Sequence, residues 1–299
     1  KYWLAKAYKR LGNEDKAEDL FEEVIENDPL EYYSFLSHYE LGQTLDPITK
    51  VNEIDPLKDE TFDWLYSLGE FDVAKQYLDS KRREWKESKL RVASLPLYKK
   101  IGHYDAMISQ VYSLSQESRR ELIEENPTYA FPTPYKEEVK AAAKKFNVEP
   151  ELIYAISRQE SAFNQHARSW ADAFGVMQII PEKAKILGQR YQIPYRDHDD
   201  LFTPQTNVLL GASLLNELNK MFDGIFPLYV ASYNASDSAV RKWYKERYSG
   251  DLIEFIEMIP YAETRKYVKL VMRNFFIYKK INSSESIEFT TNFFTSQLN

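Results

Sequence analysis

The chain of 299 residues is long enough for two domains, and its hydrophobic content of 43% excludes wholesale disorder. No stretch approaches about 18 uninterrupted apolar residues, so no membrane span is expected. Because the sequence contains no cysteine, disulfide bonds, thiolate nucleophiles and cysteine-based zinc sites are excluded. The net charge is −7, and residues 135–299 carry 21 basic and 20 acidic side chains, so the acidic excess lies in the first 134 residues. Neither half has the basic patch of a nucleic-acid-binding protein, and no nucleic-acid partner is expected.

Residues 1–130 are predicted to form helix after helix. A Leu-Gly or Ile-Gly pair recurs at Gly12, Gly42, Gly69 and Gly102, with separations of 30, 27 and 33 residues that suit paired helices. Each glycine is expected to end a helix in the left-handed conformation. The pattern predicts an α-solenoid, which serves either as a scaffold for the next domain or as a concave surface for a protein partner. Six residues match the second part of a tetratricopeptide-type repeat in type and spacing: Ala5, Tyr8, Gly12, Ala17, Phe21 and Pro29.

A proline-rich segment separates the two halves. Pro127, Pro132 and Pro134 fall within eight residues, and prolines at this density stop helices and keep the chain extended. We therefore expect a domain boundary near residue 131. The next helix is predicted over residues 136–146.

The stretch at 153–181 contains the strongest candidate for chemistry. Leu152, Ile153 and Ile156 are spaced to bury one face of a helix, and Glu160 follows Ile156 by one turn on that face. Partial burial of a carboxylate disfavours its charged form and raises its pKa. A carboxyl group with a raised pKa is suited to act as a general acid near neutral pH.

Three motifs lie in order along the second half. The first is Arg158-Gln159-Glu160-Ser161 with Phe163, followed by Ser169 and by the segment GVMQIIP at 175–181. The second is ASYNA at 231–235, and the third is FIEMIPYAETRKYV at 255–268. Together they resemble the motifs of the soluble lytic transglycosylases. The resemblance covers roughly residues 131–281.

This resemblance implies a mostly α fold in which a lysozyme-like catalytic domain follows the helical repeats. It implies non-hydrolytic cleavage of the β-1,4 bond between N-acetylmuramic acid and N-acetylglucosamine in peptidoglycan. Glu160 would act first as acid and then as base, with assistance from the N-acetyl group of the substrate, and would leave a 1,6-anhydro end. The substrate-binding residues carried over from the motifs are Ser169, Met177, Gln178, Tyr233, Asn234, Glu257 and Tyr261.

Other interpretations of these residues stay open. Most glycosidases use a second carboxylate, so Asp172 or Glu257 could hold a water in a hydrolytic muramidase. The chain could also be an inactive glycan-binding or assembly module. Ser169 could be a turn hydroxyl, Met177 a core residue and Tyr233 a buried helix residue with a satisfied hydroxyl. Asp172 is expected to be a solvated loop residue.

No metal or cofactor is expected. The acidic residues Asp197, Asp199 and Asp200 lack the glycine and distal glutamate of an EF-hand loop. The four histidines show no metal-binding spacing and are expected at the surface: His38, His103, His166 and His198.

The domain prediction has three parts: helical repeats at 1–130, the catalytic domain at 131–285 and a tail at 286–299. In the tail Phe293 and Phe294 are expected to be exposed, and part of the tail is expected to be ordered against the helical repeats. The expected location is the bacterial periplasm. The chain opens inside a helical pattern, so we expect a fragment, or a mature protein whose leader has been lost. The expected partners are glycan strands, with a possible protein partner through the repeats.

Overall fold

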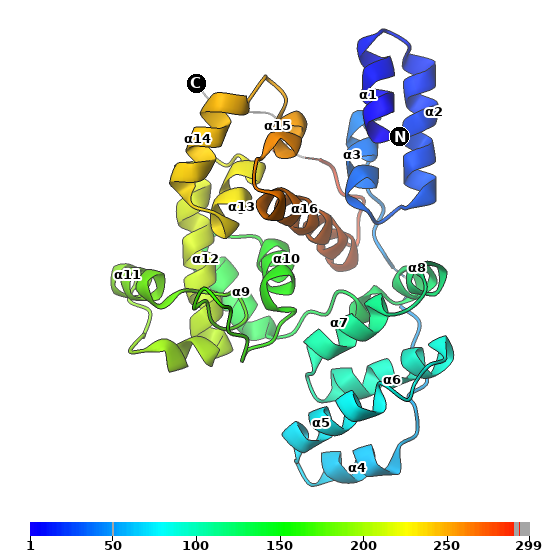
Figure 1. Cartoon of the computed structure of the whole chain (residues 1–299), viewed down its shortest axis with the longest axis vertical. Coiled ribbons are helices and arrows are strands. Elements are labelled where there is room, and N and C mark those ends of the chain that lie inside the picture. Colours follow the sequence, from blue (N-terminus) through cyan, green and yellow to red (C-terminus); the bar gives the residue numbers. More distant parts are fainter. Residues whose placement is uncertain (50, 290–292, 294–299) are drawn as a thin grey trace. The chain divides into compact units, whose positions relative to one another are not determined.

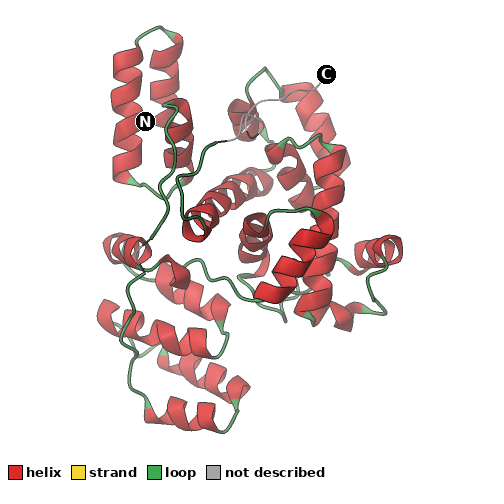
Figure 2. Cartoon of the chain, turned by 180° about the vertical axis from the view of Figure 1, so that it is seen from behind, coloured by secondary structure: helices red, strands yellow, loops and turns green. Residues whose placement is uncertain are grey.

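The computed structural model describes residues 1–49, 51–289 and 293. Within these residues the regular secondary structure is helical, with only isolated β-bridges besides (Figure 2). The predicted mostly α fold is confirmed. None of the helices described is both long and apolar enough to cross a membrane.

Packing divides the chain into two compact units. The first unit comprises Lys1–Pro47, Lys140–Gln159 and Leu209–Asn299, and the second comprises Ile48–Val139 and Glu160–Val208. Each unit therefore contains segments from both halves of the sequence. The boundaries at 130 and 285 stay a prediction.

Helices make up the first part of the chain, and several of them are joined by tight turns, whereas a long irregular segment connects α3 to α4 (Figure 1). The four glycines of the repeat pattern have positive φ, between the +66° of Gly42 and the +74° of Gly12 and Gly69, as predicted. Glycine adopts this conformation without the steric cost of a side chain, so each can end a helix sharply. The elements are α1 (Tyr2–Arg10), α2 (Glu14–Asn27), α3 (Tyr32–Glu40), α4 (Glu60–Ser67), α5 (Phe71–Lys81), α6 (Ser88–Lys100), α7 (Tyr104–Tyr112), α8 (Gln116–Glu125) and the 3-10 helix η1 (Pro127–Tyr129).

The second part of the chain contains the two longest helices described, α12 with 18 residues and α16 with 21. Leu152, Ile153 and Ile156 on α10 are buried, which confirms the predicted apolar face of that helix. In the first unit α13 and α16 pack through aromatic side chains, with the rings of Phe226 and Phe275 centred 5.4 Å apart. The elements are α9 (Lys136–Phe146), α10 (Pro150–Ser161), α11 (Pro181–Tyr191), η2 (His198–Phe202), α12 (Pro204–Met221), α13 (Phe226–Asn234), α14 (Asp237–Arg247), α15 (Leu252–Met258) and α16 (Ala262–Asn282).

The C-terminal segment is less exposed than expected. The prediction for Phe293 is wrong: its side chain is buried, and its ring stacks on Phe226 with centroids 4.2 Å apart. The aromatic rings of Phe226 on α13 and Phe275 on α16 supply an apolar surface that the Phe293 ring covers. Ile287 also exchanges backbone hydrogen bonds of 2.9 Å with Leu45. Phe294 lies outside the described residues.

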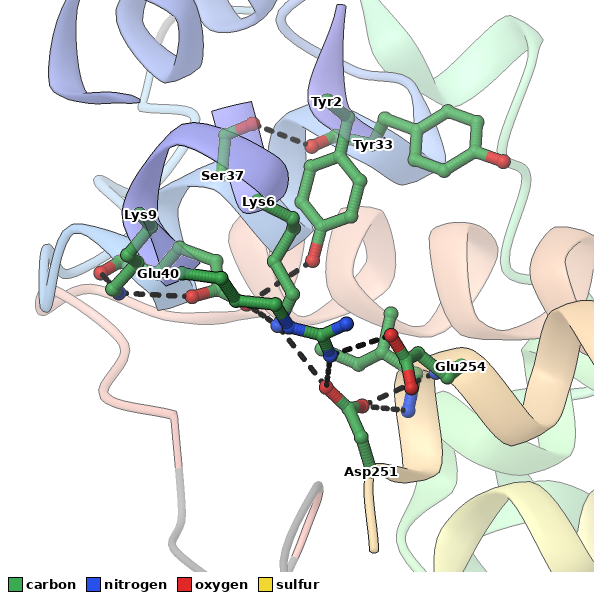
Figure 3. A network of polar contacts seen from close by, with 10 residues as sticks. Tyr2, Lys6, Lys9, Tyr33, Ser37, Glu40, Asp251 and Glu254 are labelled. Carbon is green, nitrogen blue, oxygen red and sulfur yellow. Dashed lines mark hydrogen bonds and ion pairs between the residues drawn. The ribbon is translucent and has the colours of Figure 1, made fainter. Parts of the chain in front are cut away.

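A polar network ties α1 and α3 to the start of α15 within the first unit (Figure 3). Lys6 Nζ lies 2.7 Å from Glu40 Oε1 and 3.1 Å from Asp251 Oδ2. Lys9 Nζ approaches Glu40 Oε2 at 2.9 Å, and the hydroxyl of Tyr2 donates to Oε1 of Glu40 at 3.2 Å. Burial alone raises the pKa of Glu40, but the hydrogen bonds and charges of the two lysines outweigh burial and lower it.

Replacement of Glu40 by Gln should destabilise the chain by about 1–3 kcal/mol at neutral pH, because Lys9 loses its carboxylate partner and the largely buried Lys6 keeps only Asp251. A carboxyl group with a depressed pKa stabilises the fold above its unfolded pKa and stops doing so as the pH falls through its folded pKa. The difference between wild type and Glu40→Gln in urea denaturation should therefore shrink in acid. Glu22→Gln on the exposed face of α2 is the matched control and should change little. A penalty that is independent of pH would contradict the ionic explanation.

Candidate active site

Glu160 stands in the last turn of α10 and is half-buried. The apolar face that ends at Ile156 anchors the helix, so the carboxyl group is presented by a rigid element. The next residue, Ser161, fixes the end of the helix because its Oγ donates to the carbonyl of Val176 at 2.8 Å. The helix end is thereby joined to the glycine-containing loop of the first motif.

The backbone directly after Glu160 is strained. Ala162 and Phe163 have φ of +50° and +68°, a left-handed conformation that each non-glycine residue adopts at a cost of order 1 kcal/mol. The Phe163 side chain is buried, and its carbonyl accepts the hydroxyl hydrogen of Tyr135 at 3.1 Å. Burial raises the pKa of Tyr135 to about 12, so this hydroxyl stays protonated and keeps donating. Strain that the surroundings hold in place is typical of functional sites.

A chain of polar contacts leads from the helical repeats to this segment, within the second unit. Asn164 Nδ2 donates to Asp105 Oδ2 at 3.0 Å, and Asn164 Oδ1 accepts the amide hydrogen of His166 at 2.9 Å. His103 lies between two aspartates, with Nδ1 2.9 Å from Asp105 Oδ1 and Nε2 3.1 Å from Asp79 Oδ2.

The expectation of a surface role for His103 is wrong, since its side chain is only 15% exposed. Burial alone lowers the pKa of His103, but the hydrogen bonds and charges of Asp105 and Asp79 outweigh burial and raise it. Burial alone raises the pKa of Asp105, but the hydrogen bond and charge of His103 outweigh burial and lower it. Sequence spacing gave no signal for this cluster, because its members come from three separate segments.

The loop that carries Ser169 closes on itself. The backbone N–H of Ser169 donates to the carbonyl of Ala173 at 2.9 Å, and its Oγ accepts the amide hydrogens of Ala171 at 3.2 Å and Ala173 at 3.1 Å. Ser169 is therefore a turn hydroxyl, the structural role that the sequence left open. Because the two lone pairs of its oxygen receive N–H groups, the hydroxyl hydrogen is the part suited to a substrate acceptor.

Asp172 is a solvated residue of the same loop, as expected. Its Oδ1 lies 2.6 Å from Arg168 Nη2, and both side chains are more than 60% exposed. An exposed pair of this kind contributes little to stability.

Gln178 and Met177 follow the loop in different environments. Gln178 has φ of +52°, and its side-chain amide donates to the carbonyls of Gly175 at 2.9 Å and Ala167 at 3.3 Å. The Met177 side chain is fully buried, which favours the core role that the sequence left open.

Asn207, at the start of α12, holds the loop in place. Its fully buried side chain donates to the carbonyls of Phe174 at 2.8 Å and Leu201 at 2.9 Å, and accepts the amide hydrogen of Met177 at 2.7 Å. Gly175 has φ of +77°, and a Cβ there would lie 2.1 Å from the carbonyl oxygen of Leu201 and 2.4 Å from Asn207 Nδ2. The close approach therefore requires glycine.

The remaining predicted substrate-binding residues belong to the first unit, whereas Glu160, Ser169, Met177 and Gln178 belong to the second. Tyr233 is half-buried on α13, and the neighbouring Asn234 accepts the hydroxyl hydrogen of Thr264 at 2.7 Å. The Tyr261 side chain is 61% exposed, and its ring meets that of Trp243 at 4.8 Å.

Glu257 is engaged within the first unit. Its Oε2 lies 2.6 Å from Lys269 Nζ, and its Oε1 accepts the hydroxyl hydrogen of Tyr33 at 2.8 Å. Among the described residues no cluster of three or more histidine and carboxylate side chains is arranged to hold a metal ion.

Comparison with known proteins agrees with the motifs. Residues 137–256 match the family model described as the transglycosylase SLT domain. The predicted family resemblance is confirmed. The matched residues include Glu160, Ser169, Met177, Gln178, Tyr233 and Asn234, and the match ends just before Glu257. Residues 1–30 match a tetratricopeptide repeat model.

Relatives support the same assignment. The chain is 41% identical over 157 residues to a putative soluble lytic murein transglycosylase of Haemophilus influenzae, covering 52% of this chain and 26% of that protein. An inactive glutamate-to-glutamine mutant of lytic transglycosylase Slt from Pseudomonas aeruginosa has a similar structure. Its TM-score is 0.80 at 25% identity, covering 99% of this chain and 48% of that one. The 70 kDa soluble lytic transglycosylase of Escherichia coli has the same fold, with a TM-score of 0.77 at 23% identity, covering 97% of this chain and 48% of that one. The chain thus spans about a quarter of its curated relative and about half of each structural relative.

Replacement of Asn207 by Ala should destabilise the chain by about 3 kcal/mol, because three buried backbone groups lose their hydrogen-bond partner. Thermal unfolding measures the loss, and Asn219→Ala, on an exposed position of the same helix, is the control. Equal melting temperatures for the two variants would contradict the role assigned to Asn207.

Replacement of His103 by Gln should lower the free energy of unfolding, and this loss should depend on pH as expected for a histidine with a raised pKa. The protonated histidine stabilises the fold fully below its unfolded pKa of about 6.5, and this contribution is lost as the pH rises through the folded pKa. In strong acid it also weakens, because Asp105 becomes protonated. Urea denaturation from pH 4 to 9 should give a penalty of about 1–2 kcal/mol near pH 6 that declines at higher pH. His166→Gln, at an exposed position, is the control. A loss of stability in His103→Gln that grows with pH would contradict a raised pKa for His103.

Proposed function

We propose that the chain carries the catalytic domain of a peptidoglycan lytic transglycosylase, with Glu160 as the acid and base. One observation carries the proposal: Glu160 ends a buried helix within the SLT domain, and the strained segment and hydrogen-bonded loop that follow hold Ser169 and Gln178 in fixed positions. A site that is held in place before the substrate binds is what catalysis by positioning requires.

The proposed reaction proceeds in two proton transfers. The protonated Glu160 gives its proton to the glycosidic oxygen between N-acetylmuramic acid and N-acetylglucosamine as the bond to C1 breaks. The N-acetyl oxygen of the muramic acid stabilises C1 meanwhile. The Glu160 carboxylate then takes the proton from the C6 hydroxyl of the same sugar, whose oxygen attacks C1 and closes the 1,6-anhydro ring. Glu160 ends protonated as it began, and no water is consumed.

The hydrolytic alternative needs a second carboxylate that holds a water. Asp172 forms an exposed ion pair with Arg168, and Glu257 is paired with Lys269 and Tyr33. Each carboxylate is thus engaged by a neighbour in its own unit, which favours the mechanism with a single glutamate.

The backbone strain at the site disfavours the alternative that the chain is an inactive glycan-binding module. Two consecutive left-handed residues after Glu160 lower the stability of the fold, and a domain that only binds glycan has no need of them. In the Pseudomonas aeruginosa transglycosylase of similar structure, a glutamate-to-glutamine mutant is inactive.

Peptidoglycan glycan strands are the proposed substrate, and the periplasm of a bacterial envelope is the proposed location. The helical repeats are proposed to act mainly as a scaffold beside the SLT domain. A protein partner bound by the repeats stays a prediction.

Mass spectrometry of purified peptidoglycan after digestion tests the proposal. The wild-type protein should release products one water lighter than reducing muropeptides, and Glu160→Gln should release at least about a thousandfold less because the amide cannot donate the proton. Glu182→Gln, at an exposed position of α11 in the same domain, is the control and should match wild type. Reducing ends in the wild-type digest would establish hydrolysis instead. Undiminished product from Glu160→Gln would remove Glu160 from the mechanism.

A further inference from the structure

The tip of the loop that carries Ser169 presents an aromatic ring that the fold does not use. Trp170 is 98% exposed, whereas Trp85 and Trp243 are 7% and 6% exposed. A tryptophan so exposed buries almost no apolar surface and so contributes almost nothing to folding. A single exposed apolar residue needs no explanation by itself, but Trp170 differs in how its loop is held and in what surrounds it.

Trp170 stands on a rigid base. The hydrogen bonds of Ser169 to Ala171 and Ala173 bracket it, and an antiparallel bridge between Arg168 and Phe174 closes the loop. Phe174 is buried, and its ring meets those of His198 at 5.4 Å and Phe202 at 5.6 Å. The backbone at the tip is therefore fixed while the indole side chain faces solvent.

The charges at the tip cancel. Arg168 and Asp172, the charged residues that flank Trp170, pair with each other at 2.6 Å. A surface for anionic lipid or for a charged peptide would keep an excess of one sign. A flat, rigid and locally neutral aromatic surface instead suits the face of a neutral pyranose ring, whose C–H groups carry partial positive charge and meet the negative face of the indole.

We propose that Trp170 is a sugar-stacking residue that binds a pyranose ring of the glycan strand beside the position reached by the hydroxyl of Ser169. This inference rests on the proposed function for its substrate class and adds a binding residue to it. The indole touches no reacting atom, so it acts on affinity for the glycan and leaves the chemical step unchanged. Loss of such contacts raises KM without lowering kcat.

Trp170→Ala and Trp170→Phe test the assignment, with Trp64→Ala as the matched control, since Trp64 is 61% exposed on α4 of the repeats. On soluble glycan strands without peptides, Trp170→Ala should raise KM roughly three- to tenfold with kcat within about twofold of wild type. Trp170→Phe should recover most of the affinity, and Trp64→Ala should match wild type. Equal melting temperatures show that the variants fold. An unchanged KM for Trp170→Ala would overturn the inference.

Binding measured without turnover separates this inference from the proposed function. In the Glu160→Gln background, a titration with oligosaccharides of N-acetylglucosamine should change the tryptophan fluorescence. This fluorescence change should persist with Trp64→Ala. It should disappear with Trp170→Phe, because the phenylalanine ring still binds the sugar but does not contribute to the tryptophan fluorescence. Calorimetry of the same oligosaccharides should give a weaker Kd for Trp170→Ala, whether or not wild type releases anhydro products. A defect that appears only with peptide-bearing strands would assign Trp170 to the stem peptide and overturn the sugar-stacking role.

Discussion

The three hydrogen bonds of the Asn207 side chain are the constraint on which the candidate site depends. The loop between α10 and α11 has few backbone groups paired in regular structure, and buried backbone groups need partners. From a single buried position Asn207 accepts from Met177 and donates to Phe174 in this loop, and it also donates to Leu201 in η2. Gly175 makes this possible, because any side chain there would occupy the space of the amide. Asn207 and Gly175 therefore act together, although 32 residues separate them in the sequence.

The same loop shows how strain is kept at the site. The left-handed residues after Glu160 would relax if the segment were solvated, since each costs free energy without a local benefit. The buried ring of Phe163, the hydroxyl of Tyr135 and the amide of Asn164 together offset that cost. Two of these contacts lead back to segments before α9. The helical repeats of the second unit and the segment after Glu160 are thus parts of one packed structure.

In the first unit, ionic contacts join segments that are distant in the sequence. Glu40 and Glu257 each receive a lysine and a tyrosine hydroxyl, and the two tyrosines lie 38 and 224 residues away in the sequence. Partial burial makes these contacts specific, because a lysine or glutamate left unpaired in such a position costs more free energy than one at the surface. The N-terminal helices are therefore part of the same compact unit as α15 and α16.

The sequence alone determined several elements and the family resemblance. Helices form from local periodicity and capping, so the repeat glycines, the apolar face of α10 and the start of α12 were predictable from residues a few positions apart. The order and spacing of the motifs were enough to identify the resemblance that the comparisons confirm. The predicted role of each binding residue stays a prediction, and the structure adds what each side chain contacts.

Only the tertiary structure decided those contacts. Glu257 matches a substrate-binding position by motif, yet its partner Tyr33 lies 224 residues away. The sequence around His103 gave no sign of burial, because its partners are distant in the sequence. Asp79, which contacts Nε2 of His103, lies 24 residues before it, and Asn164, which donates to Asp105, lies 59 residues after Asp105. Phe293 was expected to be exposed, but α13 and α16 together offer aromatic rings that cover it. Local pattern fixes which face of a helix is apolar, whereas the partner of a polar or terminal side chain depends on which distant segment the fold brings to it.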